Sequence, residues 1–125
     1  MRILLDTNVF LWTLLGSSRA ESARELVLDS TTDVFISAAS WWEIAIKIGI
    51  GKLNLDFARA RAQSERSGFF DLAVTASHAE AVTKLPVLHR DPFDRMLVAQ
   101  AVSEPMKLLT GDKQLAEYSE LVYLI

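Results

Sequence analysis

The sequence predicts an α/β domain built on a parallel sheet that is covered by helices. Short apolar runs of strand length, such as residues 2–5 and 107–110, alternate with longer segments in which apolar residues recur at helical spacing. Acidic residues stand where several of these runs give way to a helix. Strands that alternate with helices favour a parallel sheet, because each helix returns the chain to the starting edge of the sheet.

The length and composition predict a single domain that spans residues 1–125. Hydrophobic residues make up 50% of the chain, so a domain of this length buries a core without disulfide bonds, and there is no cysteine to form them. Asp6 interrupts the first apolar run before a secretory core could form, and no other apolar run is long enough for a membrane span. We therefore expect a soluble, cytoplasmic protein.

In the first half of the chain, the pattern predicts two strands and three helices. These are a strand at 2–5, a helix from 7 to 14, a helix at 19–30, a strand at 34–36 and a helix at 39–48. The last helix has the clearest apolar stripe, whose members at i, i+3, i+4 and i+7 are Trp41, Ile44, Ala45 and Ile48.

The second half continues the alternation. It predicts a helix at 57–66, a strand at 69–74, a helix at 77–85, a helix that opens at Asp91-Pro92, a strand at 107–110, a short helix after Asp112 and a strand at 121–124. Asp91 before Pro92 is the preferred order at a helix start, because the aspartate caps free N–H groups and proline has none to satisfy.

Four acidic residues, spread over nearly the whole chain, lie at the starts of predicted helices. They are Asp6, Glu43, Asp94 and Asp112. Three of them follow predicted strands, at the carboxyl edge where open α/β sheets bind ligands, and Asp94 comes from a helix between strands. Hard divalent cations prefer carboxylate oxygen, so the pattern predicts a metal site at this edge.

Each of these acids also has a purely structural explanation. Asp6 and Asp112 could cap the helices that follow them. Glu43 stands three residues after Ser40, which is the spacing of a capping box, and four before Lys47, which is the spacing of a helical ion pair. The positions of the acids alone therefore do not separate a metal site from helix caps.

The sequence around the acids is more specific. Four segments stand out: residues 4–8 followed by Leu11-Trp12, residues 40–47 continuing to Leu53, residues 89–101, and residues 109–112 with Tyr118 downstream. In this order they resemble the PIN-domain ribonucleases and, within them, the VapC-like toxins of type II toxin–antitoxin pairs. The third segment is the longest match, and together the four span the chain almost end to end.

This resemblance implies a PIN-like three-layer α/β/α fold with a mainly parallel sheet. It also implies a metal-dependent endoribonuclease that uses Mg²⁺, with Mn²⁺ as the alternative, and leaves a 5′-phosphate and a 3′-hydroxyl. The residues that match the family's acidic quartet, as catalytic groups and metal ligands, are Asp6, Glu43, Asp94 and Asp112. We expect supporting roles for Asn8, Thr110, Asp91, Lys47 and Arg95, with Asp91 as a helix cap and either Lys47 or Arg95 as a phosphate contact.

The partners implied by the resemblance are an RNA substrate such as tRNA, a second copy of the chain and a VapB-like antitoxin. The antitoxin's C-terminal segment would cover the acidic groove and place an Arg or Lys among the carboxylates. We expect the interface to include Trp42, because Trp41 already occupies the apolar stripe. The net charge of −3 argues against nucleic-acid binding through bulk electrostatics.

Two other functions fit the sequence less well. A phosphoryl-transfer enzyme with Asp6 as its nucleophile would need a second aspartate two residues later, where Asn8 stands. A catalytically silent PIN-like module that binds RNA or protein would be expected to have lost a quartet acid, and all four are present. His78 and His89 lack the spacing for metal-independent ribonuclease chemistry, and we expect both to be structural.

Overall fold

The computed structural model describes all of residues 1–125 and contains one five-stranded parallel sheet. The strands are β1 (Arg2–Leu5), β2 (Asp33–Ser37), β3 (Phe70–Leu72), β4 (Lys107–Thr110) and β5 (Val122–Leu124). Their order across the sheet is β3-β2-β1-β4-β5, so the first strand is also the central one. The predicted parallel sheet is confirmed.

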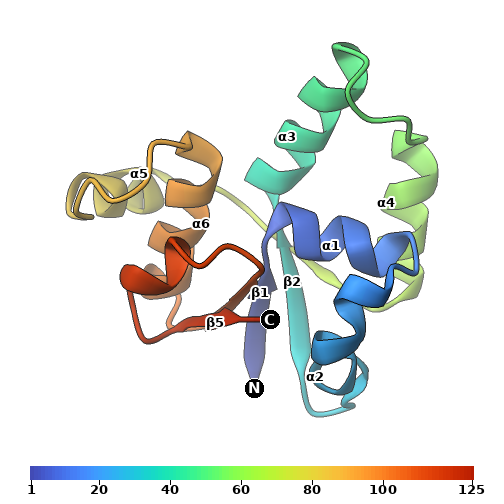
Figure 1. Ribbon diagram of the computed structural model, residues 1–125, viewed down its shortest axis with the longest axis horizontal. Helices are drawn as coiled ribbons and strands as arrows, with labels where there is room; N and C mark the ends of the chain where they lie inside the picture. The colour runs from blue at the N-terminus through green and yellow to red at the C-terminus, as the bar shows by residue number, and fades with distance from the viewer.

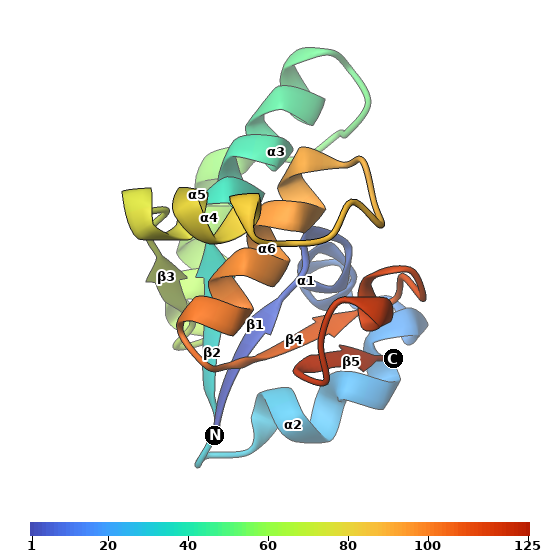
Figure 2. The same ribbon diagram turned by 90° about the vertical axis from the view of Figure 1, so that its left-hand side faces the viewer.

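Helices cover both faces of this sheet. They are α1 (Thr7–Leu14), α2 (Arg24–Leu28), α3 (Ala38–Gly49), α4 (Phe57–Arg66), α5 (Ala76–Thr83) and α6 (Pro92–Ser103), with short 3₁₀ segments η1 (Ser18–Ala23) and η2 (Leu115–Glu117). Figure 1 shows α1, α2 and α4 on one side of β1 and β2, and α5 and α6 on the other. Figure 2 shows α6 lying across the sheet.

Alternating side chains of β1 supply a separate core on each face. Ile3 and Leu5 join a cluster with Phe10 of α1 and Trp41 of α3, whereas Leu4 joins a second cluster that includes Leu97 of α6. Successive side chains of a strand point to opposite faces, so a short run of consecutive apolar residues fits a central strand covered on both faces. The apolar start of the chain is therefore a strand buried on both sides.

Two predicted elements are shorter in the structure because of local contacts. The helix predicted at 19–30 is divided into η1 and α2 and ends at Leu28, where the Asp29 carboxylate accepts hydrogen bonds from the backbone N–H and hydroxyl of Thr31. The strand predicted at 69–74 is only β3. Its last pairing is Leu72 with Ser37, and β2 ends there because α3 begins at the next residue.

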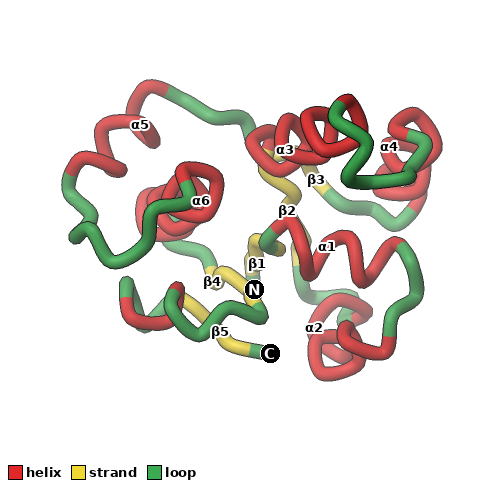
Figure 3. Tube along the Cα trace, turned by 45° about the horizontal axis from the view of Figure 1, so that its top comes forward, coloured by secondary structure: helices red, strands yellow, loops and turns green.

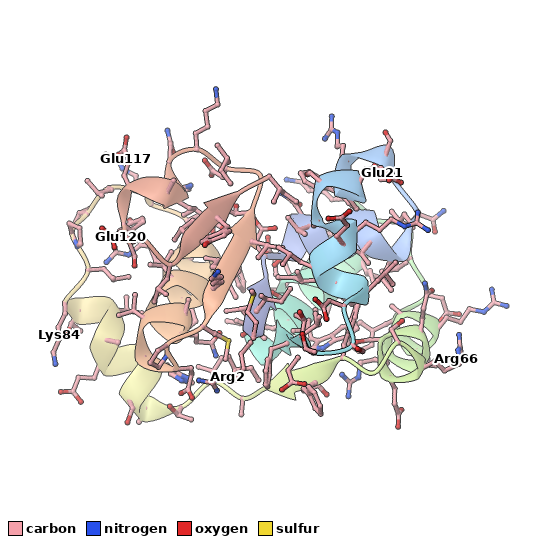
Figure 4. The ribbon with its side chains drawn as sticks, turned by 90° about the horizontal axis from the view of Figure 1, so that it is seen from below. Arg2, Glu21, Arg66, Lys84, Glu117 and Glu120 are labelled. Carbon is pink, nitrogen blue, oxygen red and sulfur yellow. The ribbon has the colours of Figure 1, made fainter.

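Three exposed basic residues lie on different parts of the chain, Arg2 on β1, Arg66 at the end of α4 and Lys84 directly after α5. Figure 4, seen from below, shows Arg2, Arg66 and Lys84 separated from one another at the periphery of the molecule. Arg2 donates to the backbone carbonyl of Glu104, which fastens the start of β1 to the end of α6. None of the helices combines the length and the apolar character that a membrane-spanning helix needs.

Candidate metal centre

The four predicted acids lie at the carboxyl edge of the sheet, at or above the ends of β1, β2 and β4. Asp6 follows β1 directly, Asp112 follows β4 after one residue, Glu43 comes from α3, and Asp94 from the first turn of α6. Figure 3 shows the starts of α1, α3 and α6 gathered around this edge. The structure therefore brings residues from the two ends of the chain close enough for their charges to interact.

Asp6 is the most deeply buried of the four, with 5% of its surface exposed. One oxygen, Oδ1, accepts a hydrogen bond from the Val9 N–H at 2.8 Å, so the predicted capping of α1 is confirmed. The other oxygen accepts from the hydroxyl of Thr110. Burial raises the pKa of Asp6, and the negative charges of Glu43 and Asp112 raise it further, against the lowering effect of the two hydrogen bonds.

Glu43 lies in the second turn of α3, so its predicted place at the start of a helix was wrong. Ser37 is the residue that caps α3, through a hydrogen bond from the Ala39 N–H at 3.0 Å, because β2 ends in an extended backbone at this position. The capping box with Ser40 was therefore also wrong, and the Ser40 hydroxyl accepts from that of Thr7.

The alternative partner of Glu43, an ion pair with Lys47, is confirmed. Its Oε2 lies 3.0 Å from the Lys47 ammonium nitrogen. The second oxygen, Oε1, is buried and has no hydrogen-bond partner in the protein. Since a buried carboxylate oxygen without a partner is costly, this atom points to a group that the protein itself does not supply.

Asp94 lies in the first turn of α6, directly after the residue that caps this helix, Asp91, and the two residues that follow it. The carboxylate of Asp91 accepts from the N–H groups of Phe93 and Asp94, which confirms the predicted cap. Burial raises the pKa of Asp94 to about 7, and the negative charges of Asp91, Asp6 and Glu43 contribute in the same direction. Asp94 is therefore held in a field of like charges that a cation would relieve.

Asp112 is placed by two contacts from other parts of the site. Its backbone N–H donates to the Thr110 hydroxyl at 3.1 Å, and its Oδ2 lies 3.0 Å from Nε2 of His89. Its Oδ1 accepts from the Gln114 N–H, which is the local turn bond expected of an aspartate at this position. Thr110 thus links Asp6 and Asp112 through its hydroxyl.

His89 is the residue that the sequence reasoning missed. We expected it to be structural, but its Nε2 lies between two acids, 3.0 Å from Asp112 Oδ2 and 3.5 Å from Asp94 Oδ2. These three residues offer ligand atoms within 4.8 Å of one another. The signal was present in the sequence, because His89 opens the segment that contains Asp91 and Asp94.

The remaining predicted helpers have different surroundings. The Arg95 guanidinium donates to the carbonyl oxygens of Pro86 and Val82 and to the Tyr118 hydroxyl, so it fastens the connection before α6. Lys47 is paired with Glu43 within the site. Asn8 is exposed in the first turn of α1. Arg95 is therefore hydrogen-bonded mainly to backbone carbonyls, whereas Lys47 lies beside the acids.

The residues at this edge fit a hard divalent cation. They supply four carboxylates and no thiolate, and one buried carboxylate oxygen lacks a partner. Burial raises the pKa values of Asp6 and Asp94, and the charges of neighbouring carboxylates raise them further. A bound cation would offset this repulsion.

A family model for the PIN domain matches residues 3–121. The chain belongs to the PIN-domain family. It is 25% identical to Ribonuclease VapC22 of Mycobacterium tuberculosis, over 93% of this chain and 91% of that protein. The resemblance predicted from the four segments is thereby confirmed, and the fold is the PIN-domain fold.

Solved structures of toxin–antitoxin proteins share this PIN-domain fold. One is VapBC2 from Rickettsia felis, bound to a DNA fragment from its promoter, with a TM-score of 0.73, 15% identity, and coverage of 100% of this chain and 98% of that one. Another is a toxin–antitoxin complex from Klebsiella pneumoniae, with a TM-score of 0.67, 20% identity, and coverage of 98% of this chain and 99% of that one.

Proposed function

We propose that this PIN domain is a metal-dependent endoribonuclease and the toxin of a toxin–antitoxin pair. The observation that carries the proposal is the convergence of Asp6, Glu43, Asp94 and Asp112 at one edge of the sheet, with a buried oxygen of Glu43 left without a partner. The similarity to Ribonuclease VapC22 supports RNA as the substrate class.

The protein's own residues prepare this edge for phosphodiester hydrolysis. The Val9 N–H and the Thr110 hydroxyl hold the two oxygens of Asp6 in fixed positions. The ion pair with Lys47 orients Glu43 so that its other oxygen remains available. Bound Mg²⁺ or Mn²⁺ would supply acidity for the attacking water and positive charge for the phosphate. A site preorganised in this way needs no covalent intermediate with the enzyme.

The test is a cleavage assay on a panel of tRNAs and other structured RNAs in Mg²⁺ or Mn²⁺. We expect fragments with a 5′-phosphate and a 3′-hydroxyl, loss of cleavage in EDTA, and a rate lower by roughly 100-fold or more in Asp94→Asn, because the variant removes one charge that holds the cation.

A matched control for this assay is Asp56→Asn. Asp56 caps α4 outside the acidic cluster, and asparagine caps a helix as well as aspartate does, so this variant should cleave like the wild type. Metal-independent cleavage that persists in Asp94→Asn would rule out the metal-nuclease function. RNA binding without any cleavage would support the catalytically silent module instead.

A VapB-like antitoxin follows from the same proposal. Its support is that the solved structures of similar fold include VapBC2 and a second toxin–antitoxin complex. The negative charges of Glu43, Asp112 and Asp91, which add to burial in raising the pKa values of Asp6 and Asp94, would favour a basic side chain from a partner.

We also propose that the protein is a homodimer, joined through an apolar groove between the starts of α3 and α6. The groove has a volume of about 650 Å³, and its lining residues are Ala38, Ala39, Trp42, Ile46, Val74, Pro92, Phe93 and Met96. None of these side chains is charged, and 64% of the Trp42 surface is exposed. An apolar surface of this kind is typical of an interface between copies of a chain.

A further inference from the structure

His89 occupies a position between two of the acids, and its connections define what its ring can do there. The Asp91 N–H donates to its Nδ1 at 3.1 Å. Its Nε2 faces Asp112 Oδ2 at 3.0 Å and Asp94 Oδ2 at 3.5 Å. The side chain is mostly buried, with 15% of it exposed.

The bond from Asp91 determines which nitrogen carries the proton. A nitrogen that accepts a hydrogen bond from a backbone N–H has its lone pair free and carries no hydrogen, so the ring proton resides on Nε2. A protonated Nε2 donates a hydrogen bond but has no lone pair to offer a metal ion. As long as the Asp91 bond is made, His89 is therefore a donor toward the acids.

The main chain of His89 is also fastened. Its carbonyl oxygen accepts from the Tyr118 hydroxyl at 3.5 Å, and the same hydroxyl accepts from the Arg95 guanidinium at 3.4 Å. Arg95 in turn donates to the carbonyl of Pro86, so the connection from Pro86 to Asp91 is held at several points. The ring of His89 is thus presented to Asp112 by a constrained segment of chain.

We propose that His89 is a positioning residue, which holds Asp112 for the cation through its Nε2–H and is not itself a metal ligand. This inference rests on the proposed metal site. Histidines and other donors that orient a metal-binding carboxylate typically change metal affinity or activity by about 10–100-fold when removed.

The chain contains its own reference for this arrangement. In His78, the Thr75 N–H donates to Nδ1 at 3.1 Å, and Nε2 faces a carboxylate oxygen of Glu104 at 2.7 Å. His78 therefore has the same proton arrangement, but it joins α5 to α6 and has no part in the acidic cluster. With only two histidines in the chain, the two rings can be compared directly in one spectrum.

The test is a long-range ¹H–¹⁵N correlation spectrum of both imidazoles in ¹⁵N-labelled wild-type protein, recorded in EDTA and then with Mg²⁺. We expect both rings to carry the proton on Nε2. Mg²⁺ should shift the His89 signals, leave those of His78 in place and leave the His89 proton on Nε2. A His89 ring protonated on Nδ1, either before or after Mg²⁺, would overturn the proposal.

Two variants test the positioning role through Mg²⁺ affinity, measured by calorimetry. His89→Ala should weaken Mg²⁺ binding by about 10-fold, whereas His89→Gln should recover most of it, because a glutamine amide can place an N–H donor near the position of Nε2. Equal affinity in wild type and His89→Ala, or a glutamine variant as weak as the alanine variant, would contradict it.

Failure of the proposed function would look different. If wild-type protein bound neither Mg²⁺ nor Mn²⁺, the metal site and the role of His89 would fall together. If the wild type bound Mg²⁺ while the His89 proton left Nε2, the metal site would stand and only the positioning role would be lost.

Discussion

Asp94 is a carboxylic acid whose surroundings oppose its ionisation. Its pKa in the folded protein is raised to about 7, whereas the pKa of an aspartate in an unfolded chain is about 3.9. Between these values the folded state binds a proton that the unfolded state has lost. Unfolding therefore releases this proton, so the unfolding free energy of the metal-free protein should decrease as the pH rises from about 4 to about 7.

Asp94→Asn removes this titration, so in EDTA its unfolding free energy should depend less on pH over that window than that of the wild type. Urea denaturation at a series of pH values measures the difference. Above pH 7 the variant should be the more stable protein, and Mg²⁺ should stabilise only the wild type. Asp56→Asn should keep the wild-type slope, and an unchanged slope in Asp94→Asn would mean that Asp94 ionises normally.

At the scale of elements, the site depends on how closely the loop after β4 approaches α1. A Cβ atom added to Gly111 would lie 2.7 Å from Cη2 of the Trp12 indole, which is too close for two carbon atoms. Glycine at this position thus lets the Trp12 indole pack directly against the backbone of Gly111, next to Asp112. A side chain here would move either the indole or the loop that carries Asp112.

We expect Gly111→Ala to lower the unfolding free energy by about 1–3 kcal/mol, the usual cost of overpacking. Trp12→Phe removes the atoms that the new methyl group would meet, so the double variant should lose less than the sum of the two single losses. Chemical denaturation of the four proteins measures this coupling. Gly49→Ala, where a Cβ would meet nothing within 4 Å, is the control; purely additive losses would show that the contact is unimportant.

At the scale of the whole molecule, the apolar groove beside the acids is the proposed dimer interface. Trp42 is 64% exposed, and the centroid of its ring lies 5.2 Å from the centroid of the Phe93 ring. Both aromatic residues therefore line the groove. Each directly precedes an acid of the cluster, Glu43 and Asp94 respectively. A second copy of the chain docked here would lie close to Glu43 and Asp94.

Trp42→Glu should convert the dimer to a monomer with little effect on folding, because a charge in an apolar interface has no partner and the side chain is exposed in the single chain. Size-exclusion chromatography with light scattering gives the mass. Leu28→Glu places the same charge on an equally exposed residue of α2, and it should remain dimeric. A wild-type monomer would contradict the proposal, as would a dimer that survives Trp42→Glu.

The sequence by itself determined the order of the elements, the candidate acids and the family. These features are local or repeat along the chain: α4 has the predicted bounds of 57–66, and Asp91-Pro92 opens α6 as expected. The expectation that three of the acids lie at one edge of the sheet required only the rule that parallel strands end at the same edge. The direct use of Asp6 and Asp91 as caps was also predictable, because a cap bonds within a few residues of itself.

Only the tertiary structure decided which of several competing partners each polar side chain takes. Ser37 rather than Ser40 caps α3, and the Ser40 hydroxyl instead accepts a hydrogen bond from Thr7 of α1. His89 enters the site because the connection before α6 folds back toward the end of β4, and that contact spans 23 residues. The spacing of residues within a segment predicts whether it forms a helix or a strand. Hydrogen bonds between distant segments depend on how the layers pack, which cannot be predicted from any one segment.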